Sequence, residues 1–337
     1  MNKFKLYFLV ISVAIVLFSC NKEDDPEPIP IRDFATQYES DNTLIENYLK
    51  TSYVEEIVDN PGFPDDQNIK ISPIPAEGTQ KSIWSYYLPE EDPTKEYPQL
   101  LSINVDLHNI KYKVYYLKVR EGDVDNGSSP CRVDAVLSSY IGAYLSDNST
   151  TNTDGSINVS VTTSEFDRNE FPSNYFYLNE LVRGWQEILP QFHTGIYDGT
   201  TNPGNPAIYQ NFGAGVMFIP SGLAYYNTGT ANIPAYTPIT FSFKLYDLKR
   251  IDSDGDGILS YLEDVNNNGD LTDDDTDGDG VINVLDIDEE GDGKLTKNEI
   301  KNDAGETYSF AEIPDCSGNT TDENRIKRHL DKNCYKD

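Results

Sequence analysis

Apolar residues recur at two different periods along this chain, and the changes of period mark its predicted elements. Between residues 40 and 53 they recur every three or four positions, which predicts an amphipathic helix with Asp41 as its N-cap. Residues 69–74 and 82–88 alternate between apolar and polar, which predicts short strands joined by loops rich in Pro and Glu. We expect this region to precede or cover a larger sheet.

Two longer alternating segments, 111–119 and 132–145, predict strands of that sheet. The stretch 147–163 is rich in Ser, Thr, Asn, Asp and Gly, and 193–211 carries several Gly and Pro residues. Such stretches are too polar or too often broken for a core and are longer than most connections. We expect both to be surface insertions that could border a pocket.

The segment 176–188 changes period within itself. Its first residues alternate as in a strand, whereas its later apolar residues recur at helical spacing, at Leu181, Val182, Trp185 and Ile188. The sequence therefore predicts a helix that begins near Asn179 and packs the large indole of Trp185 against a sheet. Gly184 would allow the backbone of this helix to approach the sheet closely.

Residues 181–185, with the sequence Leu-Val-Arg-Gly-Trp, resemble the segment at the floor of the active site in FKBP-type peptidyl-prolyl cis-trans isomerases. Three further segments resemble other parts of that family and occur in the family's order: 133–145, 218–225 and 232–245. The resemblance covers roughly residues 104–250. It implies an α+β fold in which an antiparallel half-barrel sheet wraps on one helix, here with an N-terminal helical extension and a calcium-loop tail.

The resemblance also implies a prolyl-binding pocket. Trp185 would form its floor, and Leu181 and Val182 would contact the substrate at its mouth. Ile233 would cap the pocket. The remaining residues implied for the site are the walls, the loop tyrosine and a Phe-Asp pair: Tyr140, Phe241, Tyr225, Phe166 and Asp167.

Two of these residues would carry hydroxyl groups into the pocket. The resemblance implies that Tyr225 donates its hydroxyl to the substrate carbonyl. It also implies that the Asp167 carboxylate lies beside the twisted carbonyl and is held by the hydroxyl of Tyr140. Phe166 precedes that carboxylate in the chain.

An aromatic site of this kind suits the isomerisation of X-Pro bonds. Amide resonance sets a barrier of about 18–20 kcal/mol, and the twisted carbonyl is less polar than the planar amide. An apolar pocket therefore favours the transition state without a nucleophile or a catalytic cofactor. The three histidines, His108, His193 and His329, do not have metal-ligand spacing. We expect an isomerase acting on proline-containing polypeptide clients among exported proteins.

Three differences from the family pattern keep alternatives open. Tyr226 stands where many members have Gly, Asn174 stands where an aromatic residue is expected, and the insertion 193–211 could cover the site. The first alternative is a non-catalytic surface protein that binds peptides or acts as a scaffold or in adhesion. The second is a component of a larger motility or secretion assembly that uses an isomerase fold.

The N-terminus has the features of a targeting segment. Residues 1–20 comprise a positively charged start, an apolar run too short for a confident transmembrane helix, and Leu-Phe-Ser-Cys at the end. Besides an ordinary secretion signal, this ending resembles a bacterial lipobox, which implies lipidation of Cys20 and membrane attachment through the lipid. Acidic residues after Cys20 resemble the export tags of Bacteroidetes surface lipoproteins. We therefore expect an outer-membrane lipoprotein on the periplasmic face or the cell surface, with 21–39 as a tether.

The formal net charge of −31 argues against nucleic acid as a partner and points to cations or to solubility. Between residues 252 and 299, seventeen Asp or Glu against two Lys leave a net charge of −15. Carboxylates recur there at positions 1, 3, 5 and 12 of EF-hand-type loops, with Gly at position 6. The predicted ligands are Asp252, Asp254, Asp256, Ile258 (through its backbone carbonyl), Glu263, Asp264, Asn266, Asn268, Asp270, Asp275, Asp277, Asp279, Val281, Asp286, Asp288, Glu290, Asp292, Lys294 and Glu299.

Four such loops with no room for intervening helices resemble thrombospondin type 3 repeats. The resemblance implies structural Ca²⁺, and the tail should be disordered without the cation because its carboxylates repel one another. Cys316 and Cys334 are the plausible disulfide, which leaves Cys131 as a buried thiol. A helix is predicted near 322–330, capped by Thr320. The expected domains are 1–20, 21–39, 40–102, 103–250, 251–300 and 301–337.

Overall fold

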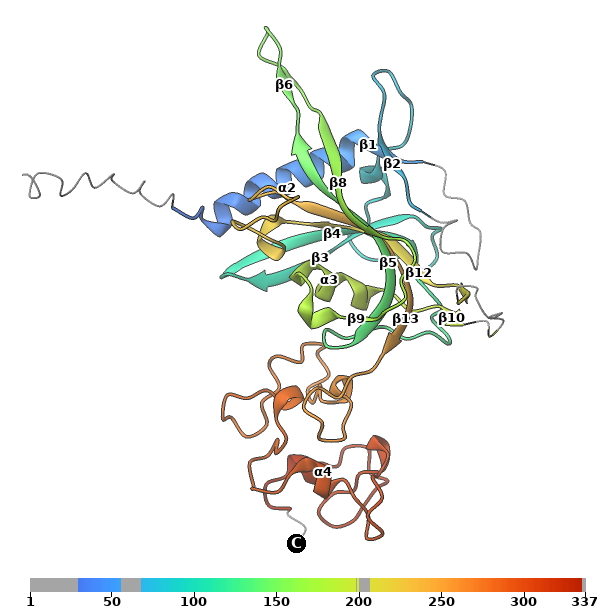
Figure 1. Ribbon diagram of the computed structural model, residues 1–337, viewed down its shortest axis with the longest axis vertical. Coiled ribbons are helices and arrows are strands. Elements are labelled where there is room, and N and C mark those ends of the chain that lie inside the picture. The colour runs from blue at the N-terminus through green and yellow to red at the C-terminus, as the bar shows by residue number, and fades with distance from the viewer. Residues whose placement is uncertain (1–29, 56–67, 198, 200–206, 335–337) are drawn as a thin grey trace, which may run out of the picture. The chain divides into compact units, whose positions relative to one another are not determined.

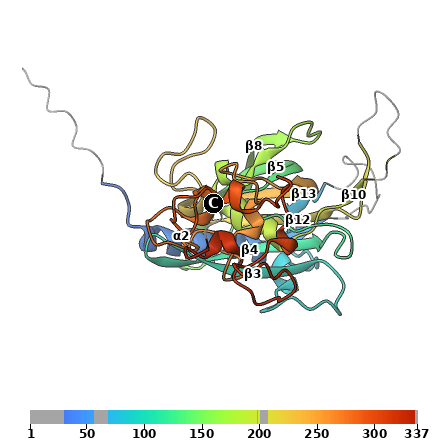
Figure 2. The ribbon, with the colours of Figure 1, turned by 90° about the horizontal axis from the view of Figure 1, so that it is seen from below.

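A large antiparallel sheet organises the chain, whose computed structural model describes residues 30–55, 68–197, 199 and 207–334. The strand order is β3-β4-β12-β13-β5-β8, and β9 also pairs with β5. Figure 2 shows this order from β3 at the bottom to β8 at the top. The strands are β3 (Gln99–Leu107), β4 (Ile110–Arg120), β5 (Ala135–Asp147), β8 (Val161–Asn169), β9 (Phe176–Tyr177), β12 (Gly213–Ile219) and β13 (Ile239–Lys249).

The described residues contain few α-helices (Figure 1), so the fold is mixed α and β with most of its order in the sheet. The α-helices are α2 (Phe34–Thr51), α3 (Arg183–Ile188) and α4 (Thr296–Glu299). Three small ribbons complete the strands: β1 (Ser52–Val54) with β2 (Ile71–Pro73), β6 (Thr150–Thr151) with β7 (Ile157–Asn158), and β10 (Ile196–Tyr197) with β11 (Tyr209–Gln210). Short 3-10 turns lie at Ile83–Tyr86, Leu178–Glu180, Leu189–Gln191, Ser221–Leu223, Ser260–Leu262, Asn283–Leu285, Phe310–Glu312 and Arg328–Leu330.

Helices lie on both faces of the sheet: α3, on which the sequence predicted the sheet to wrap, and α2, from the region predicted to precede or cover the sheet. The helix α3 packs Trp185 and Ile188 into the core on one face. On the other face, Ile45 and Leu49 of α2 pack against Tyr115, among other residues of the sheet. The strands β4 and β12 are apolar at successive positions, so both of their faces need a cover. The N-terminal helix is therefore part of the main fold.

The helix α2 begins at Phe34, six residues before the predicted start, so the tether predicted for 21–39 is too long. Asp41 lies inside the helix and is buried at 2% exposure, so its prediction as an N-cap is wrong. Its carboxylate accepts hydrogen bonds from the backbone N–H and the hydroxyl of Ser221 at 2.7 and 2.6 Å. A buried polar partner far along the chain explains an Asp that the local pattern assigned to a cap.

Other predicted elements differ in type or extent. Residues 82–88 contain a 3-10 turn in place of a strand, and 322–330 is helical only in the turn Arg328–Leu330. A 3-10 turn starts at Leu178, and the α-helix itself starts at Arg183, so Asn179 is not the helix start. Strand β3 crosses the boundary predicted between residues 102 and 103 because it pairs along its whole length with β4.

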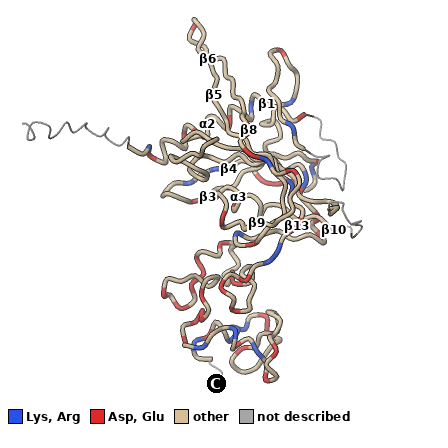
Figure 3. Tube along the Cα trace, in the orientation of Figure 1, with Lys and Arg blue, Asp and Glu red and all other residues tan. Residues whose placement is uncertain are grey.

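The acidic tail follows β13 and is made mostly of loops, with short turns and α4 (Figure 1). Figure 3 shows that Asp and Glu residues are dense along it. Its small apolar core comprises Ile258, Ile300 and Ile313. Cys316 and Cys334 form a disulfide, and Cys131 is a half-buried free cysteine.

By internal contacts the chain divides into two units, Met1–Asp33 and Phe34–Asp337. Cys20, the predicted lipidation site, and the signal segment 1–20 lie outside the described residues. Within the part of the chain that the structure describes, none of the helices has both the length and the apolar character needed to cross a bilayer.

Candidate functional site

An apolar cavity of about 300 Å³ lies beside α3, where side chains of β5, β8, β9 and β13 converge. Most of its lining is aromatic or aliphatic. The lining residues are Tyr140, Phe166, Asp167, Asn169, Phe176, Glu180, Leu181, Val182, Trp185, Tyr225 and Phe241.

Trp185 is the centre of the aromatic lining and is exposed at only 3%. Its ring centroid lies 5.1 Å from that of Phe241, 5.7 Å from that of Tyr140 and 5.8 Å from that of Phe176. The ring planes meet at 66° to 87°, the edge-to-face geometry that aromatic pairs favour. The indole is therefore fixed by three neighbours and offers a rigid surface to a ligand.

Two glycines make room for this arrangement. A Cβ atom on Gly184 would lie 2.5 Å from Cδ1 of Ile219, so its absence lets α3 approach β12, as the sequence predicted. A Cβ on Gly142 would lie 2.6 Å from the ring of Phe241 and 2.7 Å from the ring of Phe166. The missing side chain at this point of β5 is therefore what allows both rings to line the cavity.

The one carboxylate expected in the pocket is held as the resemblance implied. The Tyr140 hydroxyl of β5 donates a hydrogen bond of 2.8 Å to Oδ2 of Asp167 on the neighbouring strand β8. Burial and this hydrogen bond to a carboxylate raise the pKa of Tyr140 to about 12. The hydroxyl therefore stays protonated, and keeps donating, across the physiological pH range.

The loop that carries Tyr225 begins at the turn Ser221–Leu223, which α2 holds through the buried contact between Asp41 and Ser221. Tyr225 lines the cavity, and burial, followed by the negative charge of Asp167, raises its pKa. Tyr226 adopts a left-handed backbone with φ of +41° and turns to Phe34, with 4.2 Å between ring centroids. The Tyr at this position therefore takes the backbone conformation suited to Gly and packs against the N-terminal helix.

Eight of the nine residues that the resemblance placed in the pocket line the cavity. The exception is Ile233, which is buried at 3% in the adjoining core with Trp185 and Phe241 and, among the described residues, is not part of the lining. The sequence missed three lining residues, Asn169, Glu180 and Phe176. Phe176 supplies the aromatic wall that was expected at Asn174, and its alternation with Leu178 was the signal that could have found it.

The two predicted insertions do not line the cavity in the parts that the structure describes. Residues 150–158 form the ribbon of β6 and β7. The described ends of 193–211 form β10 and β11, whose Tyr209 packs against Tyr246, and residues 198 and 200–206 lie outside the described part.

The four acidic loops share one backbone geometry. The Gly at position 6 has a positive φ of 80° to 102° in each loop. Its N–H donates to the carboxylate at position 1 over 2.8 to 3.1 Å, in the pairs Gly257–Asp252, Gly269–Asp264, Gly280–Asp275 and Gly293–Asp288. The N–H at position 7 donates to the side chain at position 5 in the pairs Ile258–Asp256, Asp270–Asn268, Val281–Asp279 and Lys294–Asp292. The sharp turn predicted at Gly is therefore present in all four loops.

Carboxylate oxygens gather inside three of these loops. One oxygen from each of three residues lies within 4.8 Å of the other two in the sets Asp252, Asp254, Asp256; Asp275, Asp277, Asp279; and Asp288, Glu290, Asp292. The second loop has Asn266 and Asn268 at positions 3 and 5 instead, with Asp264 at position 1. Its oxygens are therefore a less charged version of the same set.

Several of the gathered oxygens are buried and have no hydrogen-bond partner among the described residues. They belong to Asp254, Asp256, Glu263, Glu290, Asp292 and Glu299. Burial raises the pKa of Asp254 to about 6, that of Asp256 to about 7 and that of Glu263 to about 8. Buried, unpaired carboxylates are costly unless a cation binds them, and an all-oxygen set suits a hard divalent ion such as Ca²⁺.

The second loop differs in detail from the others. Asp275 stands at position 12 of this loop and also at position 1 of the third loop, where both of its oxygens accept amide hydrogen bonds at 2.9 and 3.0 Å. Asp274, one residue earlier, is buried at 6% and accepts from the N–H of Asn266, whereas the loop spacing selected Asp275 and not Asp274. The side chain of Asp270 leaves the loop and binds Arg132.

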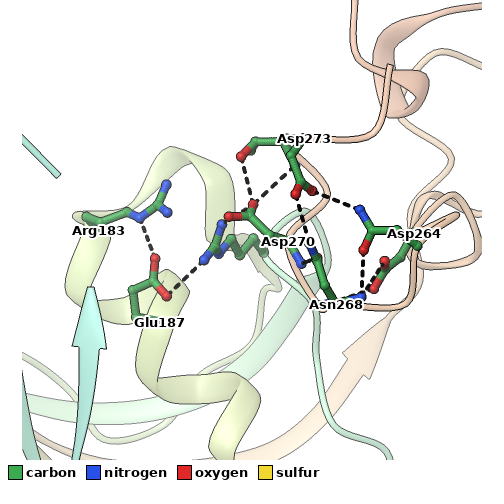
Figure 4. Close-up of polar contacts among 10 residues, drawn as sticks. Arg183, Glu187, Asp264, Asn268, Asp270 and Asp273 are labelled. Atoms are coloured by element: carbon green, nitrogen blue, oxygen red, sulfur yellow. Dashed lines mark hydrogen bonds and ion pairs between the residues drawn. The ribbon is translucent and has the colours of Figure 1, made fainter. Parts of the chain in front are cut away.

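This Arg132 contact joins the tail to the helix of the cavity, and Figure 4 labels the two carboxylates that it binds, Asp270 and Glu187. The guanidinium donates to Asp270 at 2.6 Å and to Glu187 of α3 at 3.0 Å. Glu187 also accepts from Nε of Arg183, and its side chain is exposed at only 9%. The second acidic loop is therefore linked by one cation to the helix that carries Trp185.

Comparisons with known proteins give partial matches. A family model described as BamM C-terminal matches residues 253–323. No curated protein matches the chain. The chain is similar to a solved peptidyl-prolyl cis-trans isomerase from Pseudomonas syringae pv. tomato at 16% identity and a TM-score of 0.32, covering 66% of this chain and 100% of that one. It is similar to FkpA from Escherichia coli at 25% identity and a TM-score of 0.28, covering 41% of this chain and 48% of FkpA.

Proposed function

We propose that this protein is an FKBP-like peptidyl-prolyl cis-trans isomerase that acts on proline-containing segments of exported polypeptides. The observation that carries the proposal is the cavity around Trp185, in which rings stand edge-to-face and the Asp167 carboxylate is held by Tyr140. A prolyl ring would contact the indole, and the X-Pro carbonyl would lie near Asp167 and the hydroxyl of Tyr225. These groups would favour the twisted amide over the planar one.

The chemistry needs no group beyond these side chains. The aromatic walls exclude water and bind the prolyl ring, which lowers the free energy of a twisted amide whose carbonyl has lost polarity. The Tyr225 hydroxyl, which remains protonated because burial raises its pKa, would donate to the carbonyl oxygen. The Asp167 carboxylate would lie beside the carbonyl carbon.

We further propose that the tail from Asp252 to Glu299 binds Ca²⁺ as a structural ion. The buried carboxylates without partners at Asp256 and Glu263 support this assignment, because their mutual repulsion would otherwise oppose folding. The backbone carbonyls at position 7, including that of Ile258, would complete each shell. Attachment to the outer membrane through a lipid on Cys20 belongs to the same proposal and rests on the sequence of the N-terminus.

A protease-coupled assay of proline isomerisation on the purified protein tests the proposal. Trp185→Ala removes the centre of the aromatic cluster and should abolish most of the rate enhancement. Trp84→Ala is the matched control, because Trp84 packs against Tyr87 and Tyr115 in the other hydrophobic cluster, outside the cavity. Circular dichroism of each variant shows whether it has folded.

Two outcomes decide between an enzyme and a binding domain. Catalysis by the wild type and by Trp84→Ala, with loss in a folded Trp185→Ala, supports the isomerase. If the wild type does not accelerate isomerisation in Ca²⁺, the isomerase proposal fails, and the domain is a peptide-binding or scaffold domain. Repeating the assay with a Ca²⁺ chelator shows whether the tail affects the site.

A further inference from the structure

Glu289 lies outside the ligand pattern of the acidic loops, yet its carboxylate is buried among theirs. It occupies position 2 of the fourth loop and is exposed at only 1%. One of its oxygens lies within 4.8 Å of oxygens from Asp256 and Glu263, which are positions 5 and 12 of the first loop. Two loops that are far apart in the sequence therefore direct three carboxylates at one point.

These carboxylates are not neutralised by the protein around them. Oδ2 of Asp256 and both oxygens of Glu263 are buried and have no hydrogen-bond partner within the described ranges. Glu289 itself has weak neighbours, the hydroxyl of Thr296 at 3.4 Å and Nε2 of His329 at 3.8 Å.

We propose that Glu289 is a ligand of the cation bound by the first loop, so that a single ion joins the first and fourth loops. The inference rests on the proposed Ca²⁺ function of the tail. Asp288 and Glu290, on either side of Glu289, belong with Asp292 to the carboxylate set of the fourth loop itself. Consecutive side chains would then bind two different ions, and each ion would help to position the other.

If Glu289 bridges two loops, their Ca²⁺ affinities should be coupled, whereas independent loops would bind Ca²⁺ independently. Loops one and four should take up Ca²⁺ cooperatively, because ordering either one positions a ligand for the other. The third loop differs, since its Asp277 and Asp279 are exposed and no carboxylate from the first loop belongs to its set. Its affinity should not respond to changes at Glu289.

The test is calorimetric titration of the full-length protein with CaCl₂. Glu289→Gln keeps the size of the side chain and removes the charge, and it should weaken one class of sites by about tenfold or more, which corresponds to about 1.4 kcal/mol. Glu263→Gln should weaken the same class, and the double variant should be less affected than the two single losses together. Glu323→Gln, the same change at an exposed acid of the tail, should titrate as the wild type does.

Thermal unfolding gives a second readout. The change in stability caused by Glu289→Gln should reverse its sign between chelator and saturating Ca²⁺, which a purely structural role of Glu289 would not produce. In chelator, Glu289→Gln should be at least as stable as the wild type because one repelling charge is gone. In saturating Ca²⁺ it should be less stable. Glu289→Asp, which keeps the charge but shortens its reach, provides a variant that remains informative if Glu289→Gln does not fold.

The outcomes separate this inference from the function on which it rests. Unchanged Ca²⁺ affinity in Glu289→Gln, with a wild type that binds Ca²⁺, overturns the bridge and leaves Glu289 as a buried acid packed against His329. A wild type that binds no Ca²⁺ overturns both the bridge and the proposed calcium tail, and isomerase activity is then judged separately.

Discussion

The guanidinium of Arg132 donates a 2.6 Å hydrogen bond to Asp270, and so connects the second acidic loop to the cavity domain. The same group donates to Glu187, two residues after Trp185 (Figure 4). The side chain of Arg132 is exposed at 17% and that of Glu187 at 9%, so these charges are largely withdrawn from water. Partly buried charge pairs are costly to break on one side only.

Arg132→Gln should therefore destabilise the protein. Glu187 would keep Arg183 but lose its second cationic partner, and we expect the free energy of unfolding to fall by about 1–2 kcal/mol. Urea unfolding followed by tryptophan fluorescence measures the change.

Arg168→Gln is the matched control. Arg168 also binds two carboxylates, those of Glu165 and Glu170, but its side chain is 50% exposed. Exposed pairs contribute roughly 0–1 kcal/mol, so this variant should change stability less than Arg132→Gln does. Equal losses of stability in the two variants would show that the contact between Arg132 and the tail contributes no more than an exposed ion pair does.

Tyr140→Phe should slow isomerisation without unfolding the protein. The substitution keeps the ring that packs on Trp185 but removes the hydroxyl that holds Asp167. Because this hydrogen bond is exposed to solvent, we take the roughly 0.5–1.5 kcal/mol of a typical hydrogen bond and not the larger value of a buried charged one, so we expect a loss of roughly two- to tenfold in kcat/KM.

The control for that variant is Tyr175→Phe. Its hydroxyl also donates to a carboxylate, that of Asp247, but Tyr175 packs against Tyr209 and Tyr246 away from the cavity. Activity that falls equally in both variants would count against a specific role for the bond between Tyr140 and Asp167.

Alkaline pH should destabilise the fold because several tyrosines ionise less readily in it than in the unfolded chain. Burial is the first cause of a raised pKa at Tyr48, Tyr115, Tyr116 and Tyr140. Above about pH 10 the unfolded chain releases these protons while the folded protein retains them, so stability falls as pH rises. Below that pH both states keep the protons, so these tyrosines do not make the stability depend on pH.

Urea unfolding at about pH 9 and about pH 11 measures this effect, with tyrosinate absorbance recorded in parallel. We expect a lower free energy of unfolding at the higher pH, and a rise in tyrosinate absorbance on unfolding beyond the signal that exposed tyrosines such as Tyr177 and Tyr197 give in the folded protein. The absence of any further rise on unfolding at about pH 11 would contradict the burial of the four hydroxyls.

Local patterns predicted the parts of this molecule that depend on local geometry. The Gly at position 6 of each acidic loop fixes a sharp turn through its positive φ, and spacing alone locates it. Helical spacing likewise placed Trp185 on the buried side of α3. These features follow from a few neighbouring residues.

Several contacts between distant residues were not predicted from the sequence. Asp41 looked like an N-cap because its partner, Ser221, is 180 positions away. Glu289 is not at a ligand position of its own loop, and its carboxylate neighbours belong to the first loop. Asp270 does stand at a ligand position, and its side chain binds Arg132. Such pairings depend on how elements pack, which residue spacing does not record.

Gly142→Ala tests whether the cavity needs the missing side chain on β5. An added methyl group would lie 2.6 Å from Cε1 of Phe241 and 2.7 Å from Cζ of Phe166, closer than Cβ atoms come to other atoms. Both rings line the cavity, so they would have to move into it or away from Trp185. We expect overpacking to cost about 1–3 kcal/mol of stability and to abolish most of the isomerase activity.

Gly155→Ala separates the effect of packing from the general effect of replacing a glycine. A Cβ at Gly155 meets no atom within 4 Å, although its φ of +84° adds some backbone strain. It should therefore lower the stability modestly and leave kcat/KM unchanged. If Gly142→Ala kept full activity while its melting temperature fell, the rings of Phe166 and Phe241 could shift without harm, and the catalytic argument would then rest on Trp185 and Tyr140 alone.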